Sequence, residues 1–111
     1  MSATAQPGEL PLPEATTLLT AARLSQKEDK PIHMDYYADS KTKAAFIGQD
    51  KETGDKILVK NSEEYTSLIS KTYKAGNDFL VLTENSIYIV NGNIEKKYIA
   101  ATKMLAENDE F

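Results

Sequence analysis

The fold is decided by the segment Ala75–Asn93, which reads AGNDFLVLTENSIYIVNGN. Two apolar runs, Phe79–Thr83 and Ser86–Val90, are separated by little more than Glu84-Asn85, and Asn tolerates the positive φ that tight hairpin turns need. Turn-forming Gly and Asn residues flank the pair on both sides. The segment predicts two antiparallel strands, and Ile94–Ile99 after the last turn predicts a third, so the three form a meander.

Residues 31–37 predict a strand farther upstream. Ile32, Met34 and Tyr36 are spaced by two, which is the period of a strand. Successive strand residues face opposite sides, so of Tyr36 and Tyr37 one should be buried and the other exposed. We assign the exposed position to Tyr37.

Residues 44–74 predict further β structure. The short apolar run Ala44–Gly48 is followed by the polar loop Gln49–Asp55, which indicates a hairpin. The next run, Lys56–Lys60, is apolar on both faces, and this predicts a central strand. Asn61–Thr66 has the spacing of a single helical turn and Leu68–Lys74 that of a strand, although both periods fit this region.

These segments together predict one mainly β domain over residues 31–99. We expect a small antiparallel barrel or a strongly bent sheet of about six strands, for which SH3-like and PH-like architectures are both compatible. Residues 1–30 are expected to form a mobile arm that contains a short amphipathic helix. Residues 100–111 are expected to form a short helix that frays into an acidic tail.

The helix expected in the arm spans Glu14–Gln26 and has one apolar stripe. Four apolar residues have helical spacing: Ala15, Leu18, Leu19 and Ala22. About three turns of helix are too short to be stable alone in water, so the stripe must dock on a surface. That surface is either the chain's own domain or a neighbour. The candidate partner-binding residues are Leu18, Leu19, Ala22 and Tyr37, the last because Tyr is enriched at interfaces.

Composition excludes several kinds of site. The chain has 111 residues and no cysteine, which excludes disulfides, thiolate zinc sites and iron–sulfur clusters. Thirteen basic and 17 acidic residues give a net charge of −4, which argues against general binding to a phosphate backbone. No apolar run is long enough to predict a membrane helix, and the start lacks the pattern of a secretory signal. We therefore expect an intracellular location.

The residues needed for catalysis are scarce. His33 is the one histidine, and Asp35 could share its face, which is half of an acid–base pair at best. Asp50, Glu52 and Asp55 lie in one loop, but their spacing does not match a calcium-binding loop. No nucleophile motif or phosphate-binding glycine loop occurs. We predict no enzymatic activity and no cofactor or metal site.

Two short segments combine aromatic and basic residues, the pattern of single-stranded nucleic-acid binding. The residues are Lys71, Tyr73, Lys74, Lys97 and Tyr98. The acidic total favours the alternative interpretation, in which the tyrosines pack along the core and the lysines are solvated.

A resemblance covers a little over half of the chain. The segments that carry it are Asp35-Tyr-Tyr37, Phe46-Ile-Gly48, Leu58-Val-Lys60, Glu63-Glu-Tyr-Thr-Ser67 and Thr83-Glu-Asn-Ser-Ile-Tyr-Ile-Val90. They resemble small uncharacterised proteins of large double-stranded DNA viruses. The resemblance implies a virion-associated or minor capsid protein, with a location inside the virion, and it assigns no functional residue.

The leading functional hypothesis is a non-catalytic structural or interaction module that docks on other protein subunits of an assembly through its N-terminal arm. The alternative is a small β-barrel that binds single-stranded nucleic acid. A third hypothesis, an enzyme centred on His33, has no substrate to suggest.

Overall fold

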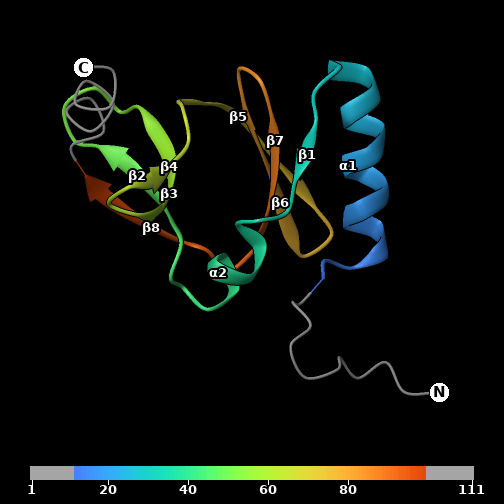
Figure 1. Ribbon diagram of the computed structural model, residues 1–111, viewed down its shortest axis with the longest axis horizontal. Coiled ribbons are helices and arrows are strands. Elements are labelled where there is room, and N and C mark those ends of the chain that lie inside the picture. Colours follow the sequence, from blue (N-terminus) through green and yellow to red (C-terminus); the bar gives the residue numbers. More distant parts are fainter. Residues whose placement is uncertain (1–11, 100–111) are drawn as a thin grey trace.

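The computed structural model describes residues 12–99, which are mainly β (Figure 1). In chain order the elements are α1 (Ala15–Glu28), β1 (Ile32–His33), α2 (Tyr37–Lys41), β2 (Phe46–Asp50), β3 (Lys56–Asn61), β4 (Glu64–Tyr65), β5 (Ile69–Ala75), β6 (Asp78–Thr83), β7 (Ile87–Asn91) and β8 (Glu95–Ile99). The short helix expected after residue 99 and the first part of the arm lie outside the described residues.

The strands form two mixed sheets rather than a barrel. The first sheet has the order β1-β7-β6-β5, and the second has the order β4-β3-β2-β8. The hairpins pair antiparallel, but β1 pairs parallel with β7, and β8 pairs parallel with β2. The sheets are not closed on each other. The mainly β prediction is confirmed. The structure has two sheets instead of one bent sheet, because β8 pairs with β2 in the second sheet and not with β7 in the first.

The first sheet is built on the segment that decided the fold. Gly76 has φ +61°, the left-handed region in which a glycine costs least, and it starts the tight turn between β5 and β6. Strand β6 lies between two neighbours, and Leu80, Val81 and Leu82 are all buried. Both faces of this strand are therefore covered, so the first sheet lies in the middle of the molecule.

Three layers follow from this arrangement (Figure 1). Helix α1 covers one face of the first sheet, and the core between them contains Ala21, Tyr37, Ala75, Leu80, Leu82, Ile87 and Ile89. The second sheet lies on the other side, where the core contains Tyr36, Ala45, Leu58, Val81 and Val90. The predicted central strand is confirmed, because β3 lies inside the second sheet with Leu58 facing this core.

Two local predictions are wrong. The strand predicted over residues 31–37 ends at His33, because the chain turns into α2. Tyr36 and Tyr37 lie at the start of this helix, where adjacent side chains point about 100° apart. Tyr37 is therefore buried under α1, whereas Tyr36 is buried between the two sheets. The helical turn predicted at Asn61–Thr66 is a tight strand connection, because the Asn61 side chain accepts a hydrogen bond from the Glu63 backbone N–H at 2.8 Å and reverses the chain into β4.

Candidate interaction surface

Helix α1 docks on its own sheet through a small, partly polar face. Thr17 and Ala21 are fully buried, and Leu24 is partly buried against the same core. The Thr17 hydroxyl lies 3.0 Å from the Ala75 carbonyl and 2.8 Å from a carboxylate oxygen of Asp78. One turn earlier, the Glu14 carboxylate accepts a hydrogen bond from the backbone N–H of Asn77 at 2.9 Å. Hydrogen bonds to the β5–β6 turn therefore fix the start of the helix.

The apolar stripe predicted for docking lies on the outside of this helix. Leu18 is 37% exposed and Leu19 is 54% exposed, and Ala15 and Ala22 are also exposed. Leu12, just before the helix, is 68% exposed. The side chains of Leu18 and Leu19 are thus exposed to water, although a short helix could have buried them. The name outer stripe is used below for Ala15, Leu18, Leu19 and Ala22.

The sequence did contain a signal for the face that is buried. Thr17, Ala21, Leu24 and Glu28 also recur at helical intervals, of four, three and four residues. A threonine and an alanine carry little apolar weight, so the larger leucines dominated the pattern. Small residues let the helix approach the sheet closely, and Thr17 is accommodated because its hydroxyl is paired.

Tyr37 is not available as an exposed anchor, which corrects the prediction for this residue. Its side chain is 6% exposed, and its hydroxyl donates to Asp78 at 3.0 Å. The Asn91 side-chain amide approaches the same hydroxyl at 3.4 Å. Burial raises the pKa of Tyr37, the bond from Asn91 lowers it, and the neighbouring Asp78 carboxylate raises it further. Tyr37 therefore ties α2 to the first sheet.

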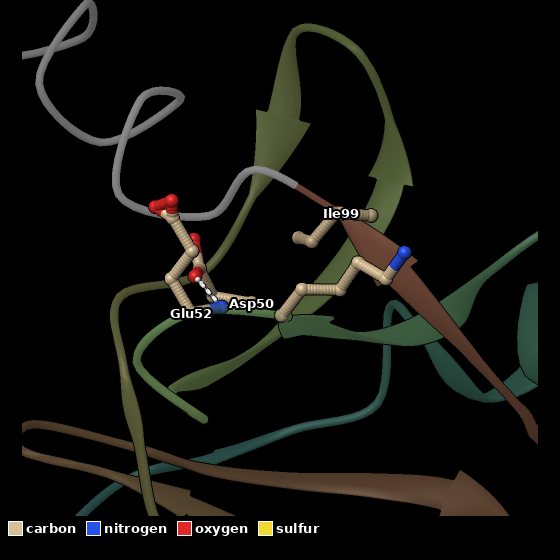
Figure 2. Close-up of a pocket in the computed structure, with 4 residues that line it drawn as sticks. Asp50, Glu52 and Ile99 are labelled. Atoms are coloured by element: carbon tan, nitrogen blue, oxygen red, sulfur yellow. Dashed lines mark hydrogen bonds between the residues drawn. The ribbon is translucent and has the colours of Figure 1, made fainter.

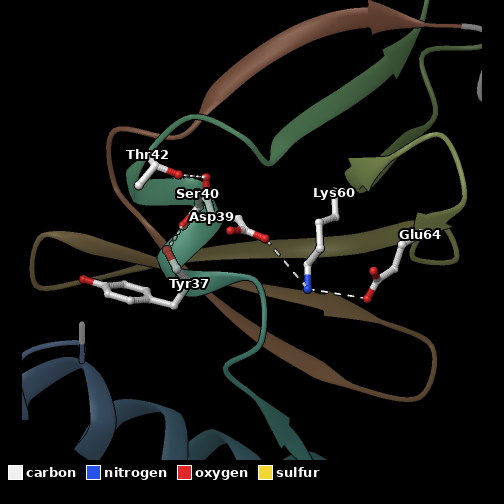
Figure 3. A network of polar contacts seen from close by, with 6 residues as sticks. All are labelled: Tyr37, Asp39, Ser40, Thr42, Lys60 and Glu64. Carbon is white, nitrogen blue, oxygen red and sulfur yellow. Dashed lines mark hydrogen bonds and ion pairs between the residues drawn. The ribbon is translucent and has the colours of Figure 1, made fainter. Parts of the chain in front are cut away.

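A second polar group joins α2 to the second sheet (Figure 3). The Lys60 ammonium lies 3.5 Å from Glu64 and 3.9 Å from Asp39, and it sits 4.7 Å from the centre of the Tyr36 ring. Burial raises the pKa of Tyr36, and the nearby Glu64, Tyr88 and Asp35 raise it further. Lys60 contacts an aromatic face and two carboxylates at once, which suits a structural role at this junction.

The residues of the nucleic-acid alternative do not form one patch. Lys71, Tyr73 and Lys74 lie on β5, at an edge of the first sheet, whereas Lys97 and Tyr98 lie on β8, at an edge of the second. The Lys97 ammonium lies over the Phe46 ring, 4.7 Å from its centre, so it already has an aromatic partner within the chain. Adjacent residues such as Lys97 and Tyr98 also point to opposite faces of their strand.

His33 has an aromatic rather than an acidic partner. Its ring stacks on Tyr88, with the centroids 5.1 Å apart, and Tyr36 meets the same Tyr88 ring edge-on at 5.4 Å. Burial raises the pKa of Tyr88, while its hydrogen bond with Ser86 lowers it. The arrangement packs the β1 end against β7 through ring contacts.

The acidic loop between β2 and β3 borders a hollow of about 290 Å³ lined by Asp50, Lys51, Glu52 and Ile99 (Figure 2). The Asp50 carboxylate accepts hydrogen bonds from the backbone N–H groups of Glu52 and Thr53, at 2.8 and 3.0 Å. This carboxylate shapes the turn. Among residues 12–99, no group of three or more His, Asp or Glu side chains is placed to hold a metal ion.

Comparison with known proteins adds no relative. No protein-family model matches the chain, and searches of curated proteins and of solved structures gave no significant match. Within residues 12–99, neither helix has the length and apolar character needed to cross a bilayer.

Proposed function

We propose that this protein is a non-catalytic interaction module, and that the outer stripe of α1 docks on a protein subunit of a larger assembly. The observation that carries the proposal is that α1 is already held on its own sheet by Thr17 and Ala21, while Leu18 and Leu19 stay exposed. A helix that needed only its own domain would gain stability by turning these leucines inward.

The geometry of the stripe fits recognition of a helix by an apolar groove. Leu18, Leu19 and Ala22 follow one another at helical spacing, which is the arrangement of anchors that such grooves accept. The rigid attachment of α1 through Glu14 and Thr17 presents these anchors in fixed positions, so binding orders few further groups. A virion-associated role, which the resemblance implies, is one setting for such a subunit contact.

The test compares two surface variants in the native lysate or particle. Leu18→Asp with Leu19→Asp should abolish partner cross-links formed through Lys27 and Lys30, and should lower partner affinity by at least about 100-fold, because two charges would enter an apolar groove. The matched control is Thr16→Asp with Arg23→Asp, which places two carboxylates on exposed positions of the same helix outside the stripe. If the leucine variant folds and still assembles normally, the proposal is wrong.

The nucleic-acid alternative has less support, because its five residues divide between two sheet edges. It makes a separate prediction: affinity for single-stranded DNA should fall steeply as salt rises. The absence of binding at low salt would remove it.

A further inference from the structure

Strand β5 forms an open edge of the first sheet. Within residues 12–99 it pairs only with β6, and its central residues 70–74 are exposed on both faces. An edge strand of this length offers unpaired backbone N–H and C=O groups to another extended segment. This edge is separate from the outer stripe of α1, and the inference drawn from it does not depend on the proposed function.

The hairpin register identifies the backbone groups that face outward. Gly76 and Asn77 form a two-residue turn, so Ala75 and Asp78 are the closing hydrogen-bonded pair. Bonded and non-bonded pairs alternate along an antiparallel ladder, so the backbone groups of Thr72 and Lys74 point away from β6. These four groups can bond to an added strand without disturbing the existing sheet.

A cleft runs beside this edge. It has a volume of about 320 Å³, and its walls are the β2–β3 loop and the first half of β5, with Gly54, Asp55, Lys56, Ile69, Ser70, Lys71 and Thr72 as its lining. Side chains of an added strand alternate between its two faces, so those on one face beside the first half of β5 would point toward the cleft. Edge and cleft together match the two requirements for recognising an extended peptide.

The charge of the edge selects the occupant. Lys56 and Lys71 line the cleft, and Lys74 follows on β5, where its ammonium lies 5.6 Å from the centre of the Phe79 ring. None of the three takes part in an ion pair among the described residues, and Asp55 is the one acidic residue in the lining. The edge is therefore locally basic on a chain whose net charge is −4.

A second copy of the chain fits this edge less well. Pairing β5 with another β5 would bring the lysines of both strands to one seam, and lysine on an edge strand is a common device against such pairing. We infer that β5 and the adjoining cleft bind an extended, acidic segment of a partner protein by strand addition.

The probe is a synthetic peptide of about nine residues in which valine and glutamate alternate. Fluorescence anisotropy with the full chain should show binding that weakens as salt rises. The same peptide with lysine in place of glutamate should bind at least about tenfold more weakly, because it meets like charges.

Two variants locate the binding site. Thr72→Pro removes an outward N–H on an edge strand, where proline is tolerated, and should weaken peptide binding about tenfold. Lys71→Glu leaves the backbone intact and should weaken it by a similar factor. The controls are Lys41→Glu, an exposed lysine on α2, and Leu18→Asp with Leu19→Asp, and both should bind the peptide as the natural chain does.

Several results would overturn the inference. They are no binding of the glutamate peptide, equal binding of the lysine peptide, or unchanged affinity in the folded Lys71→Glu variant. If sedimentation shows that the natural chain is a dimer and that the Thr72→Pro variant is a monomer, the edge would instead bind a second copy of the chain. Loss of partner assembly in the leucine variant with peptide binding retained would separate this edge from the surface on α1.

Discussion

At the scale of single residues, Asp78 connects more elements than any sequence pattern suggested. Its buried carboxylate accepts the hydroxyls of Thr17 from α1 and Tyr37 from α2, at 2.8 and 3.0 Å. It is the first residue of β6, directly after the turn at Gly76-Asn77. Its partners lie 61 and 41 residues away, so no local period could identify them.

Replacing Asp78 should weaken the whole fold. Asp78→Ala leaves the buried Tyr37 hydroxyl without its acceptor and the Thr17 hydroxyl with the Ala75 carbonyl alone, and we expect the free energy of unfolding to fall by about 2–3 kcal/mol. Asp78→Asn keeps the shape and one acceptor oxygen, so its loss should be smaller. Urea denaturation followed by circular dichroism measures both. Asp55→Ala, at an exposed loop position, is the control and should change stability by less than about 0.5 kcal/mol.

At the scale of elements, the existence of helix α1 was predicted correctly, but the side of the helix that docks was not. The period of 3.6 residues fits both Leu18 with Ala22 and Thr17 with Ala21. Hydrophobicity chose the leucines, whereas the structure buries the smaller pair because a close approach and a paired hydroxyl are possible there. Sequence periodicity therefore predicts that a helix forms. Which face of the helix is buried depends on the surface of the sheet against which it packs.

Two neighbouring alanines on α1 test this orientation. Ala21 is fully buried and Ala22 is exposed, although they differ by one position. Ala21→Asp should lower the free energy of unfolding by about 3 kcal/mol or more, because an unpaired charge enters the core. Ala22→Asp should change it by less than about 0.5 kcal/mol. Urea midpoints compare the pair, and equal losses would contradict the orientation of α1.

At the scale of the whole molecule, the buried tyrosines make stability depend on alkaline pH. Tyr36 and Tyr37 lie in the two cores and Tyr88 packs, partly buried, against the second, and burial is the largest cause that raises the pKa of each above 10.0, the ordinary value. The unfolded chain then loses these protons more readily than the folded one. Their contribution to stability is complete below pH 10 and is lost as pH rises toward the higher folded values.

The measurement is a series of urea denaturations between about pH 9 and pH 11. Each of these phenols should remove about 1.4 kcal/mol of stability per pH unit, but only between its unfolded and its folded pKa. Tyr36→Phe takes one of these groups away, so its stability should fall less steeply over the same range than that of the natural chain. Parallel slopes for the two chains would show that the Tyr36 phenol does not contribute.

Sequence reasoning reached the mainly β class and the β6–β7 hairpin, but the three-strand meander predicted over residues 79–99 is wrong, because β8 pairs with β2 and not with β7. The hairpins were visible because their turns are local, as at Gly76-Asn77. The division into two sheets depends on β8 pairing with β2, and no sequence signal identifies which distant strand a strand will join. The open edge at β5 follows from the same division, since a closed barrel would have covered it.

The pairing of β2 with β8 also sets an order in time. Phe46 is paired with Glu95, which the ribosome adds 49 residues later. The nascent chain can form the β5–β6–β7 meander as soon as those strands emerge, but β2 must wait until residues 95–99 have been made before its second neighbour exists. A product that stopped before Glu95 would keep the meander and present β2 as a bare strand on which unfinished chains could aggregate. Among the strands of residues 12–99, β8 is therefore the one whose synthesis covers the open edge of β2.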